Sequence, residues 1–129
     1  RNVRMQLEKT LRALAKNDGL TLIMALSYSG RTEIVEAVRD IAREVRAGRL
    51  EPAAINEQVI AQHLWTRDIP DPDVLIRTSG EMRVSNFLLW QISYAELVIT
   101  PTLWPDFRKP QFYVALEEYA RRHRRFGGI

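Results

Sequence analysis

The stretch DVLIRTSGEMRVSNFLLWQISYAELVI, residues 73–99, decides the expected fold. Its apolar run at 74–76 is typical of a short buried strand, and a second apolar run ends the stretch. Ser85 and Asn86 are good N-cap residues, and the apolar sequence that follows them, up to residue 94, predicts a largely buried helix. The stretch therefore predicts a strand, a polar loop, a helix and a second strand.

The polar loop carries two arginines, Arg77 and Arg83, together with Gly80 and Ser85. Backbone N–H groups and the helix dipole favour negative charge at a helix N-terminus, and guanidinium groups form forked hydrogen bonds with phosphate oxygens. Ser85 can donate a further bond, and Gly80 gives the loop backbone freedom. These features indicate a phosphate site. In the alternative, an ordinary surface loop, Arg77 and Arg83 would pair with Glu81 and other nearby acids.

Composition limits the class of protein. A length of 129 residues fits one domain or part of one, and a hydrophobic content of 46% is enough for a core. No apolar run reaches the roughly 20 residues of a transmembrane helix. The lack of cysteine excludes a disulfide, a thiolate metal site and a cysteine nucleophile. This composition fits a cytoplasmic protein.

The net charge is only +3, and much of it comes from four arginines near the end: Arg121, Arg122, Arg124 and Arg125. Such a run suits the last turn of a helix, where cations complement the dipole. It lacks interleaved aromatic residues, so no nucleic-acid partner is expected. The cluster is also a hint of lipid contact, which would add a peripheral position at the membrane surface.

The rest of the chain predicts further strand–loop–helix organisation. Apolar residues at helical spacing predict a first helix: Val3, Leu7, Leu11 and Leu14. The run LTLIMAL at 20–26 predicts a buried strand, followed by a polar loop at 27–31 and a helix over about 32–47. A short helix capped by Asn56 and a last helix opened by Pro110 complete the prediction. The strand–loop–helix unit over about 20–47 and the one within residues 73–99 together predict an α/β fold with a parallel sheet covered by helices.

Glu96 lies at the boundary between the predicted helix and the second strand. A buried carboxylate in this position needs a partner. A nearby arginine would be one partner. A hard divalent cation that bridges to phosphate oxygens, as Mg²⁺ commonly does, would be another. The spacing leaves both open.

Four ordered segments closely resemble the cis-prenyltransferase family. They are RTSGEMRVSNFLLWQ at 77–91, YAEL at 94–97, LWPDF at 103–107 and RRFGG at 124–128. The resemblance extends over essentially the whole chain, which makes it far more specific than a lone short motif. It implies a parallel-sheet α/β fold with flanking helices, of which residues 1–129 would be the C-terminal part of a single domain.

The resemblance implies a transferase that condenses isopentenyl diphosphate with an allylic diphosphate such as farnesyl diphosphate. The product would be a long-chain cis-polyprenyl diphosphate, of the undecaprenyl type that serves as a cell wall lipid carrier. The resemblance also implies Mg²⁺ as the cofactor and a homodimer as the assembly.

The resemblance also assigns roles to individual residues. The isopentenyl diphosphate head group would be held by Arg77, Arg83, Val84 and Ser85. Glu96 matches the family's magnesium-binding glutamate. The tail, with Arg125 and Gly127, would reach the neighbouring subunit's site across a dimer interface.

The chain also departs from the family pattern. The N-terminal motif with the family's magnesium-binding aspartate is absent, as is the asparagine assigned a proton-accepting role, so the catalytic residues stay unknown. Ionising an allylic diphosphate needs a metal-neutralised leaving group, and the 129-residue chain alone is therefore expected to be inactive. Ser27 and Ser29 stand where the family usually has asparagine and glycine, and Met82 stands where a polar residue is common.

Two alternatives remain at this point. One is a non-catalytic partner subunit of a heteromeric cis-prenyltransferase. Such subunits tend to lose the diphosphate residues, so the presence of Arg77, Arg83, Ser85 and Glu96 argues against it. The other is an unrelated phosphate-binding module, which would bind many phosphorylated ligands without preferring isopentenyl diphosphate.

Overall fold

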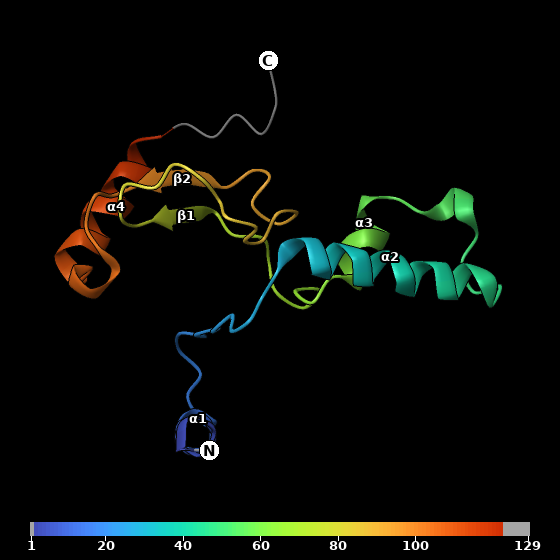
Figure 1. The fold of residues 1–129 in the computed structure, drawn as a ribbon, viewed down its shortest axis with the longest axis horizontal. Coiled ribbons are helices and arrows are strands. Elements are labelled where there is room, and N and C mark those ends of the chain that lie inside the picture. Colours follow the sequence, from blue (N-terminus) through green and yellow to red (C-terminus); the bar gives the residue numbers. More distant parts are fainter. Residues whose placement is uncertain (1, 123–129) are drawn as a thin grey trace.

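The structure, a computed structural model, describes residues 2–122 (Figure 1). The helices and strands are, in chain order, α1 (Asn2–Leu14), α2 (Gly30–Arg46), α3 (Glu57–His63), β1 (Val74–Arg77), β2 (Glu96–Ile99) and α4 (Lys109–Arg121). Short 3-10 helices lie at Pro52–Ala54 and Trp104–Asp106. None of the helices among residues 2–122 is long and apolar enough to cross a bilayer.

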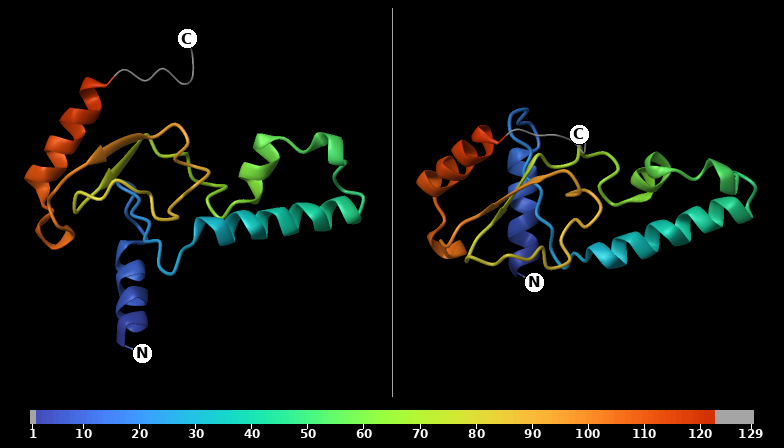
Figure 2. Two further views of the ribbon diagram at one scale, coloured as in Figure 1. Left: turned by 45° about the horizontal axis from the view of Figure 1, so that its top comes forward. Right: turned by 90° about the horizontal axis from the view of Figure 1, so that it is seen from above.

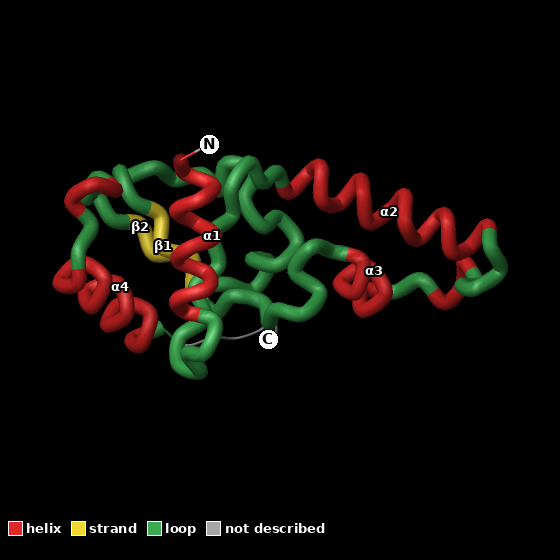
Figure 3. The backbone as a smooth tube through the Cα atoms, turned by 90° about the horizontal axis from the view of Figure 1, so that it is seen from below, coloured by secondary structure: helices red, strands yellow, loops and turns green. Residues whose placement is uncertain are grey.

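The elements form two packed groups, with α1 projecting from them (Figure 2). In one group, α4 packs against β2 of the sheet. In the other, α3 lies along α2, which extends away from the sheet (Figure 3). The small core follows this division. Its buried apolar residues are Ala37, Ile41 and Leu64 in the helical group, and Val98 and Ala115 between β2 and α4.

The two strands pair in parallel, as the sequence predicts. The register places Glu96 beside Val74 and Ile99 beside Arg77. Glu96 therefore lies at the amino ends of the strands, and Arg77 lies at their carboxyl ends. This arrangement, with helices flanking a parallel sheet, confirms the predicted α/β fold class.

The predicted strand at 20–26 is wrong in this structure. The segment is extended but carries no ladder, and it exposes its apolar side chains, with Leu20 95% exposed. A strand needs a neighbour for its N–H and C=O groups, and among residues 2–122 the two strands of the sheet pair only with each other. Apolar character alone therefore did not produce a strand.

The predicted helix at 87–94 is also wrong, because residues 85–94 form successive turns. Ser85, Asn86 and Leu88 have φ values of 49°, 64° and 44°. These values lie in the left-handed region, which a right-handed helix does not include. Ser85 and Asn86 therefore cap no helix that follows them, and the helix dipole invoked for a phosphate at this point does not exist.

The other predicted helices are confirmed, and their caps explain where they begin. The Asn56 side chain accepts from the Val59 N–H at 3.0 Å and starts α3. Pro110 lies in the first turn of α4, where its missing N–H costs no hydrogen bond. Helix α2 begins two residues earlier than expected, because Ser29 is its N-cap.

Candidate functional site

The loop that follows β1 is fastened to the chain beyond β2. The Ser79 N–H donates to the Thr102 carbonyl at 2.9 Å, and the Gly80 N–H donates to the Thr100 carbonyl at 2.9 Å. Both loop residues have positive φ, 68° at Ser79 and 66° at Gly80. The loop is thus turned across the carboxyl edge of the sheet, the edge at which open α/β sheets bind ligands.

Arg77 brings an unsatisfied donor to this edge. Its Nε is buried and has no hydrogen-bond partner among residues 2–122, and its guanidinium forms no ion pair there. Buried N–H groups without acceptors are rare and unfavourable. Bound phosphate oxygens would satisfy this donor. The alternative in which Arg77 pairs with a nearby acid is therefore wrong for the described part of the chain.

Arg83 does pair with its neighbour, because its Nη2 lies 2.5 Å from the Glu81 Oε2. Both side chains are accessible, and exposed ion pairs of this kind are weak. A diphosphate can therefore compete for the guanidinium. The backbone N–H groups of Arg83, Val84 and Ser85 make no hydrogen bond with another described residue. The structure thus gives this loop two cations and a run of unpaired donors.

Asn86 is bound to the start of α2 rather than to a helix of its own. Its carbonyl accepts from the Gly30 N–H at 2.9 Å, and its Oδ1 accepts from the Arg31 N–H at 2.8 Å. The Ser29 Oγ accepts from the Thr32 N–H, and the Ser29 carbonyl accepts from the Glu33 N–H. The N-terminus of α2 is therefore fully used within the chain and offers no donor to an anion.

Glu33 is a buried carboxylate that the sequence analysis did not single out. Its side chain is 1% exposed, and its carboxylate accepts from the Tyr28 hydroxyl, the Trp65 N–H at 2.9 Å and the Gln91 Nε2 at 3.2 and 3.1 Å. The missed signal is the spacing: Glu33 lies four residues before Ala37, on the buried face of α2.

Tyr28 is held in its protonated form. Burial, followed by its hydrogen bond with Glu33 and the charge of that carboxylate, raises the pKa of Tyr28 well above its usual range. The ring also makes edge-to-face contacts with Trp65 and Phe87. Tyr28 therefore acts as a fixed hydrogen-bond donor that links α2 to the turns at 85–94.

Glu96 has an arginine as its partner. Arg122 Nη1 lies 3.2 Å from the Glu96 Oε2 and donates to the Leu97 carbonyl at 2.8 Å, while Nη2 binds Glu118. The hydrogen bonds with Glu118 and then Glu96 raise the pKa of Arg122 above its usual value. Of the two partners left open by the sequence, the structure contains the arginine.

The described residues do not by themselves fit a magnesium site. Residues 2–122 contain no group of three or more His, Cys, Asp or Glu side chains that could hold a metal ion. Glu96 also lies three register positions from Arg77, about 10 Å along the strands. Arg77 therefore ends β1 and Arg83, Val84 and Ser85 follow in the loop after it, whereas Glu96 lies at the opposite end of the sheet. Arg125 and Gly127 lie outside the described residues.

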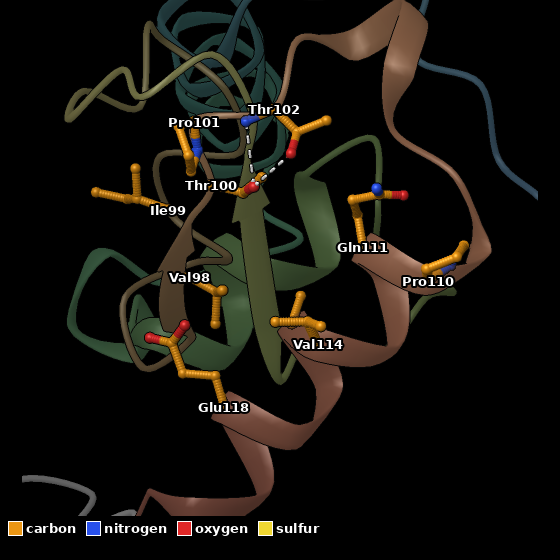
Figure 4. A pocket seen from close by; sticks show the side chains of 10 residues that line it. Val98, Ile99, Thr100, Pro101, Thr102, Pro110, Gln111, Val114 and Glu118 are labelled. Atoms are coloured by element: carbon orange, nitrogen blue, oxygen red, sulfur yellow. Dashed lines mark hydrogen bonds between the residues drawn. The ribbon is translucent and has the colours of Figure 1, made fainter.

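A separate cavity of about 290 Å³ opens between β2 and α4 (Figure 4). Val98, Val114 and Gln111 line it, with Thr100 at the end of β2 and Glu118 at the opposite end. None of its lining residues is a cation. A diphosphate needs cationic donors, so this cavity is not part of the loop site.

Residues 1–127 match the family model described as putative undecaprenyl diphosphate synthase. The chain is 54% identical over 126 residues to an isoprenyl transferase from Porphyromonas gingivalis and 52% identical over 126 residues to one from Heliobacterium mobile. The chain belongs to this prenyltransferase family, which confirms the resemblance to the cis-prenyltransferases.

Solved structures support the same assignment. Lavandulyl diphosphate synthase from Lavandula x intermedia, in complex with dimethylallyl diphosphate, matches with a TM-score of 0.88 and 42% identity over 96% of this chain. A probable undecaprenyl diphosphate synthase from Campylobacter jejuni matches with a TM-score of 0.74 and 32% identity over 98% of this chain. The chain covers 53% and 56% of those two chains, and 50% and 48% of the two isoprenyl transferases. It thus spans about half the length of its relatives.

Proposed function

We propose that this chain supplies the isopentenyl diphosphate site of a cis-prenyltransferase. The observation that carries the proposal is the buried, unpartnered Nε of Arg77 at the carboxyl end of β1. Arg83, Val84 and Ser85 follow in the same loop and add a second cation and unpaired backbone donors. Arginine forks and backbone N–H groups together suit a diphosphate.

The reaction is the condensation of isopentenyl diphosphate with an allylic diphosphate to give a cis-polyprenyl diphosphate. The loop would hold the head group of isopentenyl diphosphate and fix the orientation of its hydrocarbon part. Relatives named isoprenyl transferase and a structural neighbour that holds dimethylallyl diphosphate support these substrates. A product of the undecaprenyl type, a carrier of cell wall precursors, accords with the description of the family model.

The remaining parts of the proposal rest on the family. Mg²⁺ is the cofactor, and Glu96 is the residue of this chain expected to contribute a carboxylate, in competition with Arg122. The assembly is a homodimer in which Arg125 and Gly127 act in the neighbouring subunit's site. The protein is cytoplasmic and peripheral at the membrane surface. Residues 1–129 are the C-terminal part of one domain and are inactive alone.

The binding test uses isothermal titration calorimetry of the 129-residue chain with isopentenyl diphosphate and, separately, inorganic pyrophosphate. Arg77→Ala should weaken isopentenyl diphosphate binding by a few kcal/mol, the order expected for a lost charged hydrogen bond to phosphate. Arg39→Ala, an exposed arginine on α2, is the matched control and should bind like the unsubstituted chain. Equal affinity of the Arg77→Ala variant would mean that the site is misplaced.

Activity is tested by incorporation of labelled isopentenyl diphosphate with farnesyl diphosphate and Mg²⁺, with the intact mass recorded from the same sample. No product is expected from a 15.0 kDa chain. Turnover by a verified 15.0 kDa chain would refute the proposed inactivity. Diphosphate binding without activity in any longer form of the protein would favour a non-catalytic partner subunit.

A further inference from the structure

The turn that follows the loop site is strained. Ser85, Asn86 and Leu88 all have positive φ, and none of them is glycine. Residues in such sparsely populated conformations persist only where the surrounding structure holds them in place, and they cluster at ligand sites. The turn directly continues the segment of Arg83, Val84 and Ser85, so the side chains that hold the turn also affect the position of that segment.

The first turn of α2 is one of the two supports. Asn86 accepts hydrogen bonds from two N–H groups of α2, and its Nδ2 also donates to the Ser29 Oγ at 2.9 Å. The turn also lies close to Gly30. A Cβ at this position would lie 3.0 Å from the Asn86 carbonyl oxygen and 3.0 Å from the Leu89 Cγ. The strained turn therefore rests directly on the backbone of α2.

Glu33 is the second support, one helical turn further along α2. Its partner Gln91 is 3% exposed and donates from one Nε2 to both carboxylate oxygens and to the Thr66 Oγ1 at 2.8 Å. Every partner of the Glu33 side chain is a donor: the Tyr28 hydroxyl, the Trp65 N–H and the Gln91 amide. A carboxylate accepts all of these bonds, whereas a carboxamide would direct N–H groups at one or more of the donors.

We infer that Glu33 and Asn86 are positioning residues for the loop that carries Arg83, Val84 and Ser85, which we call the diphosphate loop. They hold residues 85–91 against α2 from the two ends of this segment, and so fix where Arg83, Val84 and Ser85 present their donors. The inference rests on the proposed function, since it concerns the same loop. Neither side chain needs to touch the ligand, because both act through the turn that they hold.

The test measures the affinity of the 129-residue chain for isopentenyl diphosphate by calorimetry. Glu33→Gln keeps the size of the side chain and removes acceptors, and it should weaken binding about tenfold or more, since small displacements of positioned groups are costly. Glu36→Gln is the matched control. Glu36 lies on the same helix, is exposed, and accepts only from the Trp65 Nε1 at 3.1 Å. This variant should bind within about twofold of the unsubstituted chain.

Asn86→Gly keeps the inference testable if Glu33→Gln does not fold. Glycine adopts a φ of 64° without strain, so this change removes the side-chain bonds to Ser29 and Arg31 while leaving the turn accessible. Binding should again fall about tenfold. Thermal unfolding is measured on every variant, so that affinities are compared only between folded proteins.

Two further measurements separate positioning from general stability. In an Arg83→Ala background, Glu33→Gln should lower affinity by a smaller factor than in the unsubstituted chain, because residues that act through one another are not additive. Glu33→Gln combined with Gln91→Glu, which exchanges donor and acceptor, should recover part of the lost affinity. Additive losses in the Arg83→Ala background would overturn the inference.

The outcomes also separate this inference from the proposed function. Unsubstituted chain that does not bind isopentenyl diphosphate would overturn both. Binding that Arg77→Ala weakens, but that Glu33→Gln and Asn86→Gly leave within about twofold, would keep the proposed function and overturn the positioning role alone.

Discussion

Arg122 binds the carboxylate of Glu96 at 3.2 Å, and the same guanidinium donates to the Leu97 carbonyl at 2.8 Å. The glutamate expected to bind Mg²⁺ is therefore held by a cation of its own chain. The positive charge of the guanidinium opposes a second cation beside this carboxylate, so Mg²⁺ at Glu96 would compete electrostatically with Arg122.

Arg122→Gln should therefore raise the affinity of the chain for divalent cations, by about three- to tenfold. Mn²⁺ binding followed by electron paramagnetic resonance measures this change without any need for activity. Arg121→Gln is the control, because Arg121 is exposed and pairs only loosely with Glu117, at 3.8 Å. If Glu96→Gln in the Arg122→Gln background left the gain intact, Glu96 would not be the carboxylate involved.

The Arg77 side chain should lower the stability of the unliganded fold and be needed for isopentenyl diphosphate binding. Its buried Nε has no acceptor in residues 2–122, so the unliganded fold carries an unfavourable donor. Arg77→Met keeps much of the apolar stem and should leave the free energy of unfolding unchanged or raise it by up to about 1 kcal/mol, while removing isopentenyl diphosphate binding. Urea unfolding and calorimetry measure the two effects. A loss of more than about 1 kcal/mol would show that Arg77 is satisfied within the free protein.

The features that could be predicted from the sequence are those that a local pattern of residues determines. The strands at 74–77 and 96–99, the caps at Asn56 and Pro110 and the α/β class followed from apolar runs and capping chemistry. The arginines that follow the first strand are also visible in the sequence, and their role in binding a diphosphate stays a prediction. These features depend on neighbours within a few residues.

The sequence failed where distant residues decide the backbone. Asn86 is a good cap residue, but its side chain accepts from the N–H of Arg31, 55 positions earlier in the chain. The backbone of Asn86 itself has a φ in the left-handed region. The carboxylate of Glu33 is buried because Trp65 and Gln91 bring donors to it. Local propensity carries no information about either contact. The run at 20–26 shows the same limit, since a strand depends on a partner that propensity does not supply.

Gly30→Ala should destabilise the fold, because the added Cβ would lie 3.0 Å from the Asn86 oxygen and from the Leu89 Cγ. Overpacking of this kind costs about 1–3 kcal/mol. Gly19→Ala is the matched control, since nothing lies within 4 Å of a Cβ at that position. Urea unfolding of both variants measures the difference. Equal stability of the two variants would mean that the turn at 85–88 can move away from α2 without cost.

Tyr28 should make the fold less stable in alkali. Burial and the bond with Glu33 raise its pKa in the folded protein, while in the unfolded chain it titrates near its usual value of about 10. Above that pH the unfolded state binds fewer protons than the folded state, so the free energy of unfolding falls as pH rises. The contribution is therefore complete below about pH 10 and is lost at higher pH.

Tyr28→Phe removes the titrating group and should flatten the fall in stability between about pH 9 and pH 11. The same change leaves one carboxylate oxygen of Glu33 without its hydroxyl donor, and it should lower stability at pH 7 by about 1–3 kcal/mol. Urea unfolding of both proteins across this pH range gives both quantities. Because every other titrating group is common to the two proteins, parallel pH profiles would show that the pKa of Tyr28 is not raised in the folded protein.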